Sequence, residues 1–188
     1  MSKVEEKKKP KVVKAIDEDL SEEDKELKEK IDMLVERVKD NSLEIQQAAL
    51  EKIKEEVSTA TSSMTSVPKP LKFLNPHYDG LKAHYEALRD GEHKKKMADL
   101  LSVLGITMSE EGTREALKFA LEGTHEGLDG WGHEYLRSLS GEVINEHTHM
   151  VNEGQTTNEL DFLVDVIIPH FIKHMEETEA IDLLLEVD

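Results

Sequence analysis

The chain has 188 residues, and its 24 Lys and Arg residues against 41 Asp and Glu residues give a formal net charge of −17. This acidic balance disfavours duplex nucleic acid as a partner, because such binding needs a positive surface, and no apolar stretch is long enough to span a membrane. The sequence contains no Cys, which excludes disulfides, thiolate zinc sites and cysteine nucleophiles and is typical of a reducing compartment.

The first 14 residues are basic, in contrast to the rest of the chain. They hold six Lys and two Glu, a charge of +4, so the remaining residues carry −17 − 4 = −21. This segment has no helical periodicity and contains Pro10, and we therefore predict a disordered basic tail over residues 1–19. The run Lys7-Lys8-Lys9-Pro10-Lys11 has the form of a short nuclear-import signal; the alternative is a solvated tail with no function of its own.

Two helices are predicted next, separated by Asp40-Asn41. Ser21 is a good N-cap for the first helix, because three acidic residues follow it where the helix dipole favours them. The first apolar stripe contains Leu27, Ile31, Leu34, Val35 and Val38. The second stripe, which Ser42 can cap, contains Leu43, Ile45, Ala49, Leu50, Ile53 and Val57. The short link predicts that the two helices are antiparallel neighbours.

Residues 58–70 interrupt the helical pattern. Pro68 and Pro70 are expected to impose extended backbone, and the apolar residues that follow them should form a short patch that Pro76 closes. We interpret this segment as a linker that fixes one docking geometry between pairs of helices. A third helix is predicted from His77 to Leu88, with a turn at residues 89–91.

The second half of the chain continues as helices. The fourth is predicted over Glu92–Met108 with Met108 facing inward, and the fifth begins near Thr113. Four glycines between residues 123 and 132 predict a loop, after which Trp131 begins the sixth helix. The seventh carries Pro169, which should kink or split it; a strand over residues 164–168 is the alternative there. The last helix begins near Glu177.

These elements predict an all-α fold of helical hairpins, arranged as an α-solenoid or as an irregular bundle. The domain should cover residues 20–188. The final helix lacks a capping residue and places Glu186 and Asp188 at the negative end of its dipole. We therefore expect the chain to be the N-terminal part of a longer repeat protein.

Nine histidines raise the possibility of a metal site. His170 and His174 would share one helix face, and a metal-dependent hydrolase could add His147 to them. Nearby carboxylates that could contribute are Glu146, Glu176 and Glu177. Solvated or partly buried histidines are the favoured interpretation, because the sequence has neither a zinc-hydrolase helix motif nor a nucleophile elbow nor a phosphate loop. We assign no catalytic, cofactor-binding or metal residue.

The only Trp, Trp131, lies beside Gly132 at a predicted helix start. A lone Trp is most often a core anchor, and a partner-binding anchor is the alternative.

Several stretches carry a resemblance to a known family. The run from Met64 to Leu74, followed by Pro76-His77-Tyr78, resembles the N-terminal region of the 26S proteasome non-ATPase regulatory subunit 2 family. Four further stretches agree in order: 20–25, 33–37, 131–135 with 141–143, and 179–184. The similarity spans roughly residues 20–188, with local departures at 107–112, 145–158 and 175–176.

This resemblance implies a non-enzymatic scaffold subunit of the regulatory-particle base, cytoplasmic and nuclear. Its implied partners are the base ATPase subunits and other regulatory-particle subunits. Ubiquitin-like shuttle factors and a deubiquitinase would bind through a repeat region beyond Asp188, so no partner-binding residue is assigned to this chain. The remaining alternatives are an independent acidic helical adaptor and the metal-dependent hydrolase described above.

Overall fold

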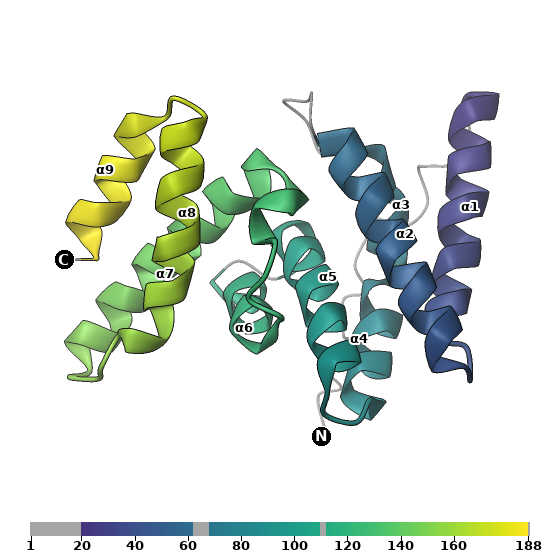
Figure 1. The fold of residues 1–188 in the computed structure, drawn as a ribbon, viewed down its shortest axis with the longest axis horizontal. Coiled ribbons are helices and arrows are strands. Elements are labelled where there is room, and N and C mark those ends of the chain that lie inside the picture. Colours follow the sequence, from purple (N-terminus) through teal and green to yellow (C-terminus); the bar gives the residue numbers. More distant parts are fainter. Residues whose placement is uncertain (1–19, 62–67, 110–111, 188) are drawn as a thin grey trace, which may run out of the picture.

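The computed structural model of the chain describes residues 20–61, 68–109 and 112–187. Within these ranges the chain forms helices joined by turns and no β-strand, which confirms the all-α prediction. Figure 1 shows the helices in a curved row that follows the order of the sequence, an α-solenoid-like arrangement. The predicted basic tail, including the run Lys7–Lys11, lies outside the described residues. In the part of the chain that is described, no helix is long and apolar enough to cross a membrane.

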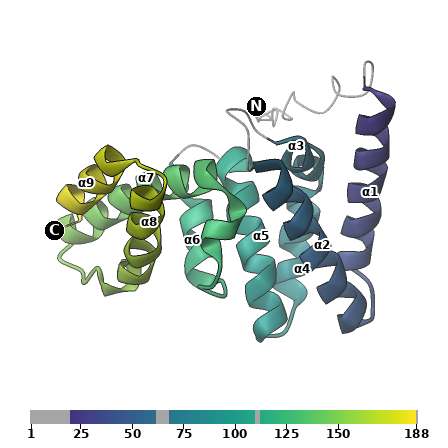
Figure 2. The ribbon, with the colours of Figure 1, turned by 45° about the horizontal axis from the view of Figure 1, so that its top comes forward.

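The first hairpin consists of α1 (Glu22–Val38) and α2 (Leu43–Thr61), which lie side by side in Figures 1 and 2. The Ser21 hydroxyl accepts a hydrogen bond from the Asp24 amide at 3.2 Å, as predicted for the cap. Both apolar stripes are buried at their centres. Leu43 and Ile45 were expected in the second stripe but are 53% and 41% exposed, and both lie in the first turn of α2.

The segment after Pro68 is a helix, and its prediction as an extended linker was wrong. Pro68 itself is extended (φ −58°, ψ 145°), but α3 (Lys69–Leu74) begins directly after it and continues into the short 3-10 helix η1 (Asn75–His77). Pro70 is compatible with α3 because a proline in the first turn removes no helical hydrogen bond. The apolar side chains of α3 are buried, and the helix packs on both α1 and α2. Residues 62–67 lie outside the described ranges.

The centre of the row is α5 (Glu92–Met108), which follows α4 (Tyr78–Ala87). Both helices lie within one residue of their predicted bounds. Ten residues of α5 are buried: His93 and the unbroken run 97–105. Neighbouring elements therefore cover this helix on most sides. Met108 was predicted to face inward but is 38% exposed, because it is the last residue of the helix.

The next elements are α6 (Glu115–Glu122), the 3-10 helix η2 (Leu128–Trp131) and α7 (His133–Asn152). In Figure 2, α6 lies beside α5. Gly105 of α5 allows this close approach, since a Cβ at this position would lie 3.1 Å from the Ala116 backbone nitrogen. The buried Ser102 hydroxyl donates to the Ala116 carbonyl at 2.6 Å and lies 2.8 Å from the Tyr135 hydroxyl, which ties α5, α6 and α7 together.

The row ends with η3 (Asn158–Leu160), α8 (Asp161–Lys173) and α9 (Glu177–Glu186). Residues 164–168, the alternative strand, are helical, and Pro169 lies inside one continuous helix and does not split it. Pro169 cannot donate the helical hydrogen bond to the Asp165 carbonyl. The loss is tolerated because both residues are exposed, so water can solvate this carbonyl. Exposed apolar side chains collect on this part of the fold: Ile172, Met175, Ile181, Leu184 and Leu185.

Candidate functional site

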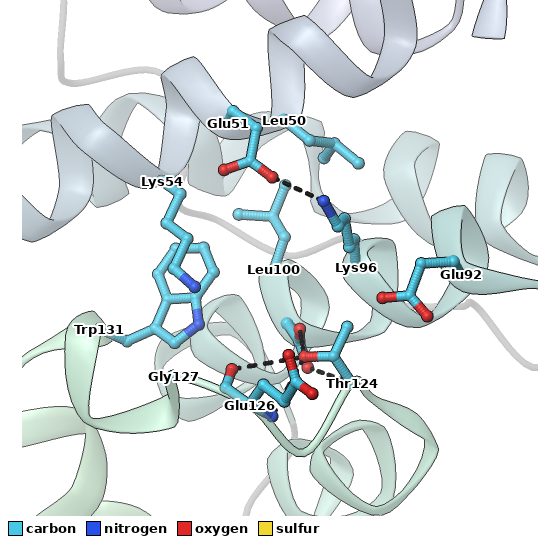
Figure 3. A pocket seen from close by; sticks show the side chains of 11 residues that line it. Leu50, Glu51, Lys54, Glu92, Lys96, Leu100, Thr124, Glu126, Gly127 and Trp131 are labelled. Atoms are coloured by element: carbon cyan, nitrogen blue, oxygen red, sulfur yellow. Dashed lines mark hydrogen bonds and ion pairs between the residues drawn. The ribbon is translucent and has the colours of Figure 1, made fainter. Parts of the chain in front are cut away.

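A cavity of about 350 Å³ opens between α2, α5 and the glycine-rich loop that precedes η2 (Figure 3). We call it the α2–α5 pocket. Its lining residues are Leu50, Glu51, Lys54, Glu92, Lys96, Asp99, Leu100, Thr124, Glu126, Gly127 and Trp131. They come from three separate segments of the chain, which only the folded row of helices brings together.

Asp99 forms the buried base of the α2–α5 pocket. Its side chain accepts two hydrogen bonds from Thr124, one from the backbone N–H at 3.0 Å and one from the hydroxyl at 2.6 Å. Burial raises the pKa of Asp99 above its usual range, although the two bonds from Thr124 oppose this rise. Gly123 lies directly against the carboxylate, since a Cβ on Gly123 would be 2.1 Å from Asp99 Oδ1. The contact therefore fixes the loop that follows α6.

Trp131 forms one wall of the pocket. The residue is 3% exposed and belongs to the hydrophobic core, which confirms its prediction as a core anchor. Its indole Nε1 is buried without a hydrogen-bond partner, and in Figure 3 this nitrogen faces the interior of the pocket. The Lys54 ammonium lies over the same ring, 5.2 Å from its centroid, in a cation–π contact.

Charged side chains surround the mouth of the pocket. Glu51 and Lys96 form an ion pair at 2.8 Å, and the hydrogen bond from Lys96 to Glu51 raises the pKa of Lys96. Glu92 and Glu126 are exposed at the other edges of the opening in Figure 3. The pocket thus combines an aromatic wall, hydrogen-bond donors and carboxylates, an arrangement suited to binding a polar group.

The predicted histidine pair also forms part of a cluster. His170 and His174 stack with their ring centroids 4.3 Å apart, as expected for residues on one face of α8. His133 of α7 joins them, with its Nδ1 3.4 Å from His170 Nε2 and its Nε2 2.9 Å from Glu176 Oε2. Burial lowers the pKa of His170, and the neighbouring His174 and His133 lower it further.

The histidines of this cluster are not the same set that the metal-hydrolase hypothesis grouped together. His147 is not part of it, and Glu146 is paired with Arg114. Sequence reasoning missed His133, because no spacing along the chain links it to α8 before α7 and α8 pack together. Across the described ranges, no three or more His, Asp or Glu side chains are placed to hold a metal ion.

A curved row of amphipathic helices that pack on their sequence neighbours defines an all-α, solenoid-like domain. Residues 31–188 match the model of the family described as the RPN1 N-terminal domain, and the chain belongs to this family. This match confirms the resemblance seen in the sequence.

The curated relatives are named as proteasome subunits. The 26S proteasome non-ATPase regulatory subunit 2 homolog A of Arabidopsis thaliana is 50% identical over 167 residues, which cover 89% of this chain and 19% of the relative. The 26S proteasome regulatory subunit rpn1 of Schizosaccharomyces pombe is 44% identical, with 90% and 19% covered. The rpn-1 subunit of Neurospora crassa is 41% identical, with 91% and 19% covered. The chain thus spans about a fifth of the length of these relatives.

Proposed function

We propose that the chain is the N-terminal helical region of a non-catalytic scaffold subunit in the base of the 26S proteasome regulatory particle. The observation that supports this proposal most strongly is membership of the RPN1 N-terminal domain family, together with relatives named as proteasome regulatory subunits. In this role the protein supports ubiquitin-dependent degradation by docking on the ATPase ring in the cytoplasm and nucleus.

The structure is compatible with a structural role that supports neighbouring subunits. Buried contacts join neighbouring helices: Ser102 with Ala116 and Tyr135 holds α5, α6 and α7 together. The outer surface of the row carries many charged side chains, which can give electrostatic complementarity to neighbouring subunits. Residues 20–188 would form one domain of the longer subunit. Shuttle factors and a deubiquitinase would bind beyond this domain.

Affinity purification of the protein from its native cells, with a tag at the end of the full gene product, tests the proposal. We expect the base ATPase subunits to co-purify with the tagged protein in near-equal amounts, and deletion of residues 20–188 should reduce their yield. Recovery of the tagged protein without any proteasomal ATPase would contradict the assignment.

The charge of the chain supports one alternative, an independent acidic helical adaptor. A net charge of −17 attracts basic partners over long distances. In that case the tagged protein would bind a basic partner in a salt-sensitive manner and would sediment separately from proteasomes.

A further inference from the structure

Two hydrogen-bond donors in the α2–α5 pocket have no acceptor among the residues that the structure describes. The buried Nε1 of Trp131 has no partner within the described residues, and leaving a buried donor unpaired is unfavourable. Lys54 lies over the same ring and forms no ion pair with any residue that the structure describes. In Figure 3 both nitrogens lie at the same end of the pocket. This end is therefore complementary to an oxygen atom that accepts hydrogen bonds.

Two other edges of the pocket offer the reverse chemistry. Glu92 and Glu126 are exposed there, and neither carboxylate has a hydrogen bond or ion pair within the described ranges. Over the whole lining, the two cations Lys54 and Lys96 face four carboxylates: Glu51, Glu92, Asp99 and Glu126. An anionic ligand would meet net repulsion, whereas a cationic group would be attracted to the free carboxylates.

A basic residue within a peptide meets both requirements. Its backbone carbonyl can accept hydrogen bonds from Trp131 and Lys54, while its positive side chain reaches Glu92 and Glu126. We propose that the α2–α5 pocket binds an Arg or Lys side chain of a partner protein, together with the adjoining peptide carbonyl. A cavity of about 350 Å³ suits a group of this size. Arg is the better fit because its planar guanidinium can bind carboxylates in a bidentate manner.

The chain itself provides a specific probe for this binding. Trp131 is the only Trp, so its fluorescence reports on the pocket alone. The 188-residue chain is titrated with acetyl-Gly-Arg-Gly-amide, with the same peptide carrying uncharged citrulline for Arg, and with acetyl-Gly-Glu-Gly-amide. We expect a saturable change in Trp131 emission with the Arg peptide, and affinity at least several-fold weaker with citrulline.

Two outcomes of this titration contradict the proposal. A Glu peptide that binds as tightly as the Arg peptide would identify a site for anions. No saturable change with the Arg peptide up to about 10 mM would mean that the pocket does not bind this group. The result is independent of the proteasomal assignment, since the titration uses the isolated chain and no proteasome subunit.

Paired charge variants test whether the free carboxylates act locally. The variant Glu92→Gln with Glu126→Gln should weaken Arg-peptide binding about tenfold. The control variant Glu86→Gln with Glu134→Gln removes the same charge from exposed positions on α4 and α7 outside the pocket lining, and it should bind like the unmodified chain. Circular dichroism confirms that both variants are folded. Equal weakening in both variants would show that binding depends on overall charge and would overturn the pocket assignment.

Discussion

Single side chains in this protein hold segments that are far apart in sequence. Asp99 on α5 accepts both hydrogen bonds that Thr124 offers, and Gly123 fits against the carboxylate where a larger residue would not. The glycines between residues 123 and 132 predicted a loop. Their pattern alone could not indicate which glycine contacts a buried acid, because this depends on how α5 and α6 pack. Steric contact with Asp99 therefore requires a glycine at position 123.

Replacing Gly123 by Ala should destabilise the fold. Its Cβ would lie 2.1 Å from Asp99 Oδ1, and Asp99 cannot move without losing its bonds to Thr124. We expect the free energy of unfolding, measured by urea denaturation, to fall by about 1–3 kcal/mol. The matched substitution Gly141→Ala lies in the exposed interior of α7 with no atom within 4 Å of the new Cβ, and it should raise stability by about 0.5–1 kcal/mol. Equal effects from both would contradict this account.

His93 should make the protein less stable in mild acid. Both ring nitrogens are buried without partners, and burial lowers the pKa of His93, with smaller contributions from His84 and Lys96. Because the folded-state pKa lies below the ordinary value near 6.5, the unfolded chain binds a proton that the folded chain releases. This contribution to stability is complete above about pH 6.5 and is lost as the pH falls towards the folded-state pKa.

The variant His93→Leu tests this effect. It removes the unpaired polar atoms, so the free energy of unfolding should rise by about 1 kcal/mol at pH 7.5. At pH 5 the gain should be larger, because the variant has no proton to release on folding. Urea midpoints at the two pH values measure the difference. A gain that is the same at both would show that His93 does not titrate differently in the folded state.

At the scale of the helices, the sequence predicted most elements because their signals are local. The bounds of α4 and α5 and the start of α9 follow from apolar periodicity and flanking turns, and they agree with the structure to within one or two residues. The prediction failed at α3, where two prolines suggested extended chain although a proline in a first turn is compatible with a helix. The pocket was not predicted, since its residues belong to three segments whose packing no local pattern specifies.

The junction of α5, α6 and α7 depends on one hydroxyl group. Ser102 donates to the Ala116 carbonyl, so the Tyr135 hydroxyl must donate to Ser102. The substitution Ser102→Ala leaves the buried Tyr135 hydroxyl without its acceptor and removes a second hydrogen bond to the Ala116 carbonyl, and it should lower the free energy of unfolding by about 1–3 kcal/mol. Tyr135→Phe should cost less, because Ser102 keeps its bond to Ala116. In a double-mutant cycle the combined loss should be smaller than the sum, and strict additivity would contradict the proposed chain of bonds.

At the scale of the whole molecule, the large negative net charge destabilises the folded state. A formal net charge of −17 on 188 residues creates self-repulsion in the folded state, and exposed ion pairs offset only part of it. Salt screens this repulsion, since the Debye length falls from about 30 Å at 0.01 M to about 8 Å at 0.15 M. The stability of the protein should therefore depend on ionic strength.

Thermal unfolding at pH 7 in a series of NaCl concentrations checks this expectation. The melting temperature should rise by a few degrees between 0.01 and 0.15 M salt, which for a chain of this size corresponds to about 1 kcal/mol. A variant in which exposed Glu residues of α1 are replaced by Gln should show a weaker dependence. A melting temperature that falls with salt would mean that the ion pairs outweigh the repulsion.

The packing of each helix on its neighbours in the sequence also determines which helices can unfold locally. Few contacts join the two ends of the row, so α1 or α9 can unfold locally while α5 keeps its buried surroundings. Amide hydrogen exchange should therefore be slowest in α5 and faster towards both ends. Because most loops to be closed are short, refolding should be rapid for a chain of this length.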